Sequence, residues 1–121
     1  MKTIMLVDDS ATVLLSMAAI LEKAGFKTEQ ASNAEAALAR FRQGLKPDLL
    51  ITDLHMPGMD GIAFIKEMRQ LPGLKFIPIL FLTTESQQEK RLEAKSAGAS
   101  GWLVKPVQAE ALLSTLKLVI H

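Results

Sequence analysis

The residues best suited to chemistry are carboxylates, hydroxyls and a lysine that follow short apolar runs. They are Asp8 and Asp9 after residues 4–7, Asp53 after residues 49–52, Thr83 and Thr84 after residues 77–82, and Lys105 after residues 102–104. Runs this apolar suit strands that are buried on both faces of a parallel sheet. Because ligands bind outside the carboxyl ends of strands in an open α/β sheet, we expect these side chains to meet at one edge.

Such a group of side chains suits the receipt of a phosphoryl group on Asp53. Close carboxylates repel each other, and a hard cation relieves the repulsion. Asp8, Asp9, Asp53 and a backbone carbonyl supply the oxygen ligands that Mg²⁺ prefers. Lys105 adds a positive charge and Thr83 a hydroxyl. In phosphoryl transfer a carboxylate can attack while cations neutralise the equatorial oxygens.

Taken singly, each of these residues has an ordinary interpretation. An aspartate after a strand is often a turn residue or a helix cap, and Thr83 can cap a helix in the same way. A lysine before a proline, such as Lys105, is often part of a solvated turn. The interpretation as a site depends on finding all of them at four strand ends of one regular pattern.

The positioning elements alternate between strand and helix. Apolar residues at helical spacing predict a first helix that Ser10 or Asp9 caps, and Ser32 with Glu35 has the form of a capping box for a second helix. Asp60 is expected to cap a third helix, and a last helix follows Pro106. Five βα units with right-handed crossovers predict an α/β fold with a single doubly wound parallel sheet.

The fourth predicted helix, over residues 86–97, differs from the others. Leu92 is its only sizeable apolar residue. Helical stability in proteins comes mostly from packing an apolar face, so we expect this helix to be held weakly. The strand before Lys105 is an expected sheet edge beside it.

Composition limits the alternatives. The 121 residues suit one domain over 1–121, and the absence of cysteine excludes disulfides and thiol chemistry. Fourteen basic and thirteen acidic residues argue against a broad nucleic-acid-binding face. No apolar run approaches the roughly 20 residues that span a bilayer. We therefore expect a soluble, cytoplasmic protein.

Four segments together carry a family resemblance: residues 6–10, 53–61, 82–85 and 98–106. On these segments the sequence resembles the receiver domain of two-component response regulators, and most closely the single-domain regulators of chemotaxis of the CheY type. The resemblance covers essentially the whole chain. It implies a flavodoxin-like (βα)₅ fold with strand order 2-1-3-4-5, in which the first and third strands are neighbours.

The resemblance also implies a role for each site residue. Asp53 is the expected phosphoacceptor, and Asp8 and Asp9 are expected to bind Mg²⁺ with the backbone carbonyl of His55. Thr83 is expected to bind a phosphoryl oxygen, Thr84 to line the phosphoryl pocket and Lys105 to pair with the phosphoryl group. The resemblance also implies that Trp102 is the switch aromatic and that the Lys105–Pro106 peptide is cis.

This chain departs from the family pattern at three positions. It has no tyrosine, and Trp102 carries only a ring N–H donor, so a latch through a hydroxyl is excluded. Plain core packing of Trp102 is the alternative to a switch. His55 is either an exposed loop side chain or, with Glu85, a residue that tunes access of water to the aspartyl phosphate. Val107 stands where the family often has phenylalanine.

The resemblance implies a phosphorylation switch and not a turnover enzyme, catalysing only its own phosphoryl transfer and slow autodephosphorylation. A histidine kinase of the CheA type is the expected donor. A flagellar motor switch protein or another docking target is expected to bind the fourth helix, fifth strand and fifth helix of a monomer. A phosphatase is a further candidate partner, whereas nucleic acid and membrane are not.

Rival interpretations remain to be compared. A stand-alone receiver outside motility, acting as a phosphate sink or relay, has the same strand ends. A flavodoxin-like cofactor binder needs a glycine-rich phosphate loop after the first strand, where this chain has acidic, glycine-free residues 8–12. A phosphatase of the haloacid dehalogenase type needs an Asp-x-Asp pattern, which adjacent Asp8 and Asp9 do not match.

Overall fold

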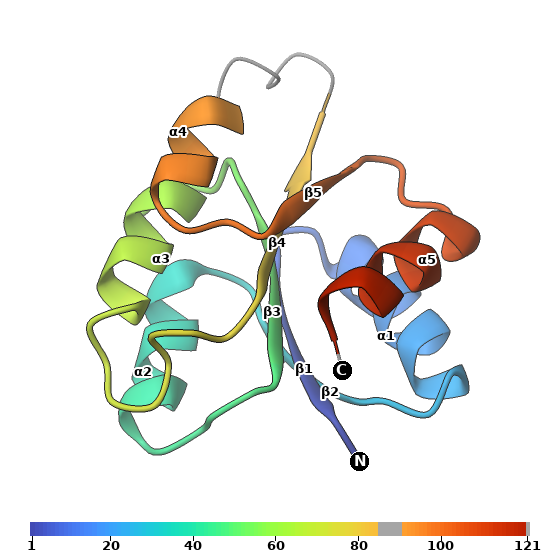
Figure 1. Cartoon of the computed structure of the whole chain (residues 1–121), viewed down its shortest axis with the longest axis horizontal. Helices are drawn as coiled ribbons and strands as arrows, with labels where there is room; N and C mark the ends of the chain where they lie inside the picture. The colour runs from blue at the N-terminus through green and yellow to red at the C-terminus, as the bar shows by residue number, and fades with distance from the viewer. Residues whose placement is uncertain (85–90, 121) are drawn as a thin grey trace.

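The computed structural model describes residues 1–84 and 91–120 as a three-layer α/β/α domain (Figure 1). Its strands are β1 (Thr3–Val7), β2 (Lys27–Ala31), β3 (Leu49–Asp53), β4 (Ile79–Thr83) and β5 (Gly101–Val104). Its helices are α1 (Ala11–Lys23), α2 (Ala34–Arg42), α3 (Gly61–Met68), α4 (Arg91–Ser96) and α5 (Ala109–Val119). All neighbouring strands are parallel, in the order β2-β1-β3-β4-β5, which confirms the predicted fold.

The sheet separates two apolar cores. Helices α2, α3 and α4 cover one face, and α1 and α5 cover the other (Figure 1). Every residue of β3 and of β4 is buried, as expected for strands that are covered on both sides. Strands β2 and β5 form the edges. No helix in the described ranges has both the length and the apolar character that a bilayer span requires.

Polar side chains fix where three of the helices begin. Ser10, Asn33 and Asp60 each accept a hydrogen bond from a backbone N–H of the following helix. The predicted cap at Asp60 is confirmed, and of the two candidate caps for α1, Ser10 and Asp9, the structure uses Ser10. The capping box predicted from Ser32 is wrong by one residue, because Asn33 has the extended backbone and its Oδ1 accepts from the Ala36 N–H at 2.7 Å.

Helix α4 has little apolar contact, as its sequence predicts. Residues 85–90, which include the first part of the predicted helix, lie outside the described residues. In the described part, Leu92 is 77% exposed and Ala94 is the buried side chain. The only large apolar residue of the segment therefore contributes almost nothing to holding α4 on the sheet.

Arg69 follows α3 and links loops that are far apart in the sequence. Its Nη1 lies 3.2 Å from the carbonyl oxygen of Leu74, 3.0 Å from that of Lys75 and 2.7 Å from that of Ile77. Its Nη2 donates to the carbonyl of Gly98, after α4, at 2.9 Å. Burial lowers the pKa of the guanidinium from its ordinary value. One side chain thus ties the α3–β4 loop to the end of α4.

We predict that Arg69→Met lowers the free energy of unfolding by about 2–3 kcal/mol, because carbonyls that shared charged hydrogen bonds lose their donor. Arg69→Lys should restore part of this loss. Arg42→Met is the matched control, since the exposed Arg42–Glu67 ion pair at 3.7 Å is of the kind that contributes at most about 1 kcal/mol. Urea unfolding measures all three, and equal losses for the Arg69→Met and Arg42→Met variants would contradict the role of Arg69.

Candidate functional site

The turn between β1 and α1 orients Asp8. Asp8 is fully buried, and its Oδ1 accepts a hydrogen bond from the Ser10 N–H at 2.8 Å. The Ser10 hydroxyl oxygen in turn accepts from the Val13 N–H at 3.3 Å, so the residue that caps α1 also fixes the Asp8 carboxylate. Asp9 is the next residue, and its side chain is exposed at the same edge.

Asp53 is the last residue of β3 and is 5% exposed. Its Oδ1 accepts a long hydrogen bond of 3.3 Å from the His55 N–H. The loop after it folds back on the strand, with the Gly61 N–H donating to the Leu54 carbonyl at 2.9 Å. A Cβ on Gly61 would lie 2.5 Å from the carbonyl oxygen of Asp53, so only glycine allows α3 to begin this close to the site.

Lys105 follows the edge strand β5 and contacts the carboxylates at the ends of both β1 and β3. Its Nζ lies 2.8 Å from Asp8 Oδ2 and 3.2 Å from Asp53 Oδ2. The Lys105 N–H donates to the Thr83 carbonyl at 2.7 Å, and the Lys105–Pro106 peptide is cis, as the resemblance implied. The structure therefore brings together the residues that the sequence predicted at three separate strand ends.

Charge and burial act against each other at this site. Burial raises the pKa of Asp53 above its ordinary value; the nearby Lys105 lowers it, but Asp8 adds to the increase. Burial by itself lowers the pKa of Lys105, but the hydrogen bond to Asp8 and the attraction of Asp53 and Asp8 outweigh burial, so this pKa is raised. Lys105 is thus held as an ammonium ion beside a carboxylate that is ionised at a cost.

The three aspartates fit a hard divalent cation. Carboxylate oxygens of Asp8, Asp9 and Asp53 lie within 4.8 Å of one another. In octahedral Mg²⁺ coordination, with ligands about 2.1 Å from the ion, opposite ligands are about 4.2 Å apart and adjacent ones about 3 Å. Small side-chain shifts, which the exposed Asp9 can make, bring this set to that geometry. The predicted fourth ligand, the His55 carbonyl, stays a prediction.

Thr83 ends β4, directly beside the Asp53 strand. Leu82 is the register partner of Asp53, so Thr83 stands one residue beyond it at the same edge. Thr83 is 1% exposed, and its Oγ1 is buried with no hydrogen-bond partner among the described residues. A buried hydroxyl without a partner is costly unless a ligand completes it. Thr84 follows it and is half-buried.

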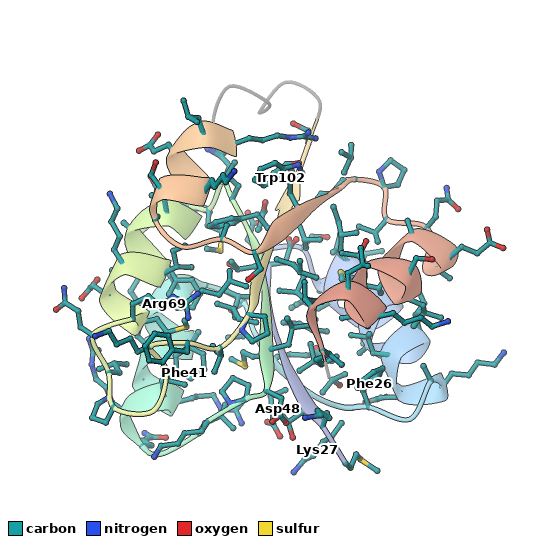
Figure 2. The ribbon with its side chains drawn as sticks, in the orientation of Figure 1. Phe26, Lys27, Phe41, Asp48, Arg69 and Trp102 are labelled. Atoms are coloured by element: carbon teal, nitrogen blue, oxygen red, sulfur yellow. The ribbon has the colours of Figure 1, made fainter. Side chains whose placement is uncertain are left out.

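Trp102 lies away from the carboxylates. The side chain is partly buried on edge strand β5, next to α4 (Figure 2), and packs against the apolar core of the α2–α4 face. The guanidinium carbon of Arg91 lies 5.1 Å from its ring centroid. No pattern in the sequence predicted this contact or the role of Arg69. The His55 side chain is exposed, and Glu85, its predicted partner in tuning water, lies outside the described residues.

Comparison with known proteins identifies the family of the site. The profile of the response regulator receiver domain matches residues 4–117. The chain belongs to the response regulator receiver family. The receiver is similar to protein PilH of Pseudomonas aeruginosa, with 35% identity over 120 residues that cover 99% of this chain and 98% of PilH.

Chemotaxis regulators are also among the relatives of this receiver. Chemotaxis protein CheY-3 of Vibrio cholerae is 37% identical over 119 residues, which cover 98% of this chain and 91% of that protein. The high-resolution structure of the chemotaxis response regulator CheY4 of Vibrio cholerae superimposes with a TM-score of 0.92 and 42% identity, covering 99% of both chains. This receiver is therefore a CheY/PilH-like component of two-component signalling, and the cofactor-binder and dehalogenase-type alternatives are set aside.

We predict that Asp53→Asn stabilises the receiver at neutral pH. Because the pKa of Asp53 is raised in the folded protein, the ionised side chain lowers stability above that pKa, and the loss disappears as the pH falls toward the ordinary value of 3.8. The midpoint of urea unfolding should be higher for the variant near pH 7, and the difference should shrink on acidification. Equal midpoints near pH 7, or a difference that grows in acid, would refute this.

Proposed function

We propose that this receiver is a phosphorylation-dependent switch that accepts a phosphoryl group on Asp53 from a histidine kinase. The observation that carries the proposal is the arrangement at three strand ends. A buried Asp53 carboxylate lies 3.2 Å from the Lys105 ammonium, and the neighbouring strand ends in the buried Thr83 hydroxyl, which has no hydrogen-bond partner in the described part of the chain. These are an acceptor, a counter-charge and a free hydrogen bond for one anionic group.

In the proposed reaction an Asp53 carboxylate oxygen bonds to phosphorus as the phosphorus–nitrogen bond of the donor's phosphohistidine breaks. The freed imidazole takes its proton from solvent. Lys105 stays paired with the new group and offsets its added negative charge. The Thr83 hydroxyl donates to a phosphoryl oxygen, which completes its hydrogen bonding, while Thr84 lines the pocket.

Mg²⁺ is the proposed cofactor. Asp8, Asp9 and Asp53 supply its carboxylate ligands, with the His55 carbonyl as a further one. The bound ion supplies positive charge that neutralises the phosphoryl oxygens. The chain's own part is to hold the Asp8 carboxylate with the Ser10 N–H and to keep Asp53 largely away from bulk water.

The proposed output is binding to a partner protein and not turnover of a substrate. Similarity to two chemotaxis proteins of comparable length supports chemotaxis as the setting, with a CheA-type kinase as donor and a flagellar motor switch protein or another docking target as recipient. The face formed by α4, β5 and α5 is the proposed docking surface of a monomer. A phosphate sink or relay outside motility is the competing role, and partner pull-down with the phosphorylated protein separates the two.

The central prediction is that beryllofluoride, a phosphoryl mimic, or acetyl phosphate changes the fluorescence of Trp102, the only tryptophan, when Mg²⁺ is present. Asp53→Asn should abolish the response, and removing Mg²⁺ with EDTA should do the same. Intact-protein mass measures the aspartyl phosphate directly. An unchanged spectrum together with no added phosphate mass would sink the proposal.

We further predict that the Lys105→Ala variant still accepts phosphate on Asp53, but that phosphorylation then has a weaker effect on Trp102 and on partner binding. Without the ammonium, the phosphoryl group loses the side chain that reaches it from β5, so the change at Trp102 and partner binding should both be weaker. Lys23→Ala, an exposed change on α1 and outside the proposed docking face, is the matched control. Phosphate mass gives acceptance and Trp102 fluorescence gives transmission, and normal transmission in the Lys105→Ala variant would refute this role.

A further inference from the structure

The position of α4 is not determined by apolar packing. In its described part the exposed fraction of Leu92 is 77%, and only the small Ala94 side chain is buried. Helices in proteins are held mainly by the burial of an apolar face, and the described part of this one buries a single methyl group. Other contacts must therefore fix where α4 lies on the sheet.

The carboxyl-terminal end of α4 is tied firmly to the rest of the domain. Beyond the helix, the Gly98 carbonyl accepts from Arg69 Nη2 at 2.9 Å. Two residues later, the Ser100 N–H donates to the Ile79 carbonyl at 2.7 Å, and the Ser100 hydroxyl accepts from the Ile79 N–H at 3.2 Å. This end is thus bonded both to the end of α3, through Arg69, and to the start of β4, the strand next to β5.

The other end of described α4 is held by a different kind of contact. Arg91 places its guanidinium carbon 5.1 Å from the centroid of the Trp102 ring. A cation over an aromatic face at this distance is attracted by the ring quadrupole, and the attraction grows when the pair is shielded from water. Arg91 Nε is buried and has no hydrogen-bond partner among the described residues, so the ring face is what compensates that buried group.

Trp102 lies on the strand next to Thr83, where a change at the proposed phosphorylation site can reach it. It pairs in register with Phe81, and both pack into the apolar core on the α4 face. Thr83 is two residues after Phe81, so it projects from the same face of the sheet. The ring that Arg91 covers therefore lies on the strand next to the unpartnered Thr83 hydroxyl.

We propose that Arg91 is the positioning residue that holds α4 in its resting place, as a releasable contact on Trp102, while Arg69 and Ser100 hold the opposite end as a pivot. The proposal rests on the proposed phosphorylation switch. When the phosphoryl group draws Thr83 toward it and the ring of Trp102 turns, Arg91 loses its aromatic face. The Arg91 end of α4 then moves and the Gly98 end stays.

The Arg91–Trp102 contact also affects how much phosphoryl group or mimic is needed to shift the receiver to its second state. Arg91 stabilises the unphosphorylated arrangement and not the other, so it biases the equilibrium between two states. A tyrosine in place of Trp102 could form a latch through its hydroxyl, but this chain has no tyrosine. The cation–π pair of Arg91 and Trp102 takes over that restraint in a form that depends on positive charge at residue 91.

The test is a titration of Trp102 fluorescence with beryllofluoride and Mg²⁺. Arg91→Met removes the charge and keeps the length of the side chain, and it should lower the half-saturating concentration about two- to fivefold. Arg91→Lys keeps a cation and should lie between the variant and the wild type. Lys95→Met, an exposed change in the same helix, should leave the midpoint unchanged. A midpoint in the Arg91→Met variant equal to that of the wild type would overturn the proposal.

A measurement without ligand separates this proposal from the switch itself. Acrylamide should quench Trp102 more strongly in the Arg91→Met variant than in the wild type, even if Asp53 accepts no phosphate. Failure of the Asp53-dependent response would then refute the proposed function, whereas unchanged quenching would refute the Arg91 contact.

Amide hydrogen exchange tests the pivot: beryllofluoride should alter exchange at residues 91–94 and not at 97–100, and the reverse pattern would refute it.

Discussion

Carboxylate oxygens of three aspartates lie within 4.8 Å of one another at one edge of the sheet, and the ammonium of Lys105 is what makes this arrangement tolerable. Two like charges about 4 Å apart near a protein surface repel by about 4 kcal/mol. Lys105 offsets this by contacting Asp8 and Asp53 together, which leaves the pair short of one positive charge. With Asp9 included, three carboxylates and one ammonium carry a net charge of minus two, which is the charge that one divalent cation neutralises.

The parallel sheet makes that balance possible. Lys105 follows an edge strand, whereas Asp8 and Asp53 follow two strands nearer the centre, and all three ends face the same way. Strands β3 and β4 are buried throughout, so the carboxylate and the hydroxyl that end them are carried by strands covered on both faces. Gly61 then lets α3 begin against the backbone of Asp53, which closes the loop over the site.

Rigidity at the site contrasts with the way α4 is held. The sheet core contributes most of the apolar burial, while the described part of α4 is held by the guanidinium of Arg91, by that of Arg69 beyond its last turn and by one buried alanine. Polar and cation–π contacts of this kind are short-range and few, so a small change in their geometry alters a large share of what holds the helix. An element with so little stability of its own suits a two-state response, because less free energy is needed to move it.

The sequence by itself determined the order of elements and the residues at the strand ends. Apolar runs and helical spacing are local patterns, and Asp8, Asp53, Thr83 and Lys105 follow from where those patterns stop. The parallel arrangement then requires them to share an edge, whatever the details of packing. The sequence also predicted that α4 is weakly held, because its one leucine offers too little apolar surface whichever way the helix faces.

Only the tertiary structure decided which partners these side chains have. Lys105 bridges Asp8 and Asp53 because three strand ends converge, and nothing near Lys105 in the sequence encodes that distance. The contacts of Arg69 with Gly98 and of Arg91 with Trp102 depend on how loops and helices dock, which local periodicity does not record. Even the cap of α2 depended on backbone conformation, which selected Asn33 over the adjacent serine.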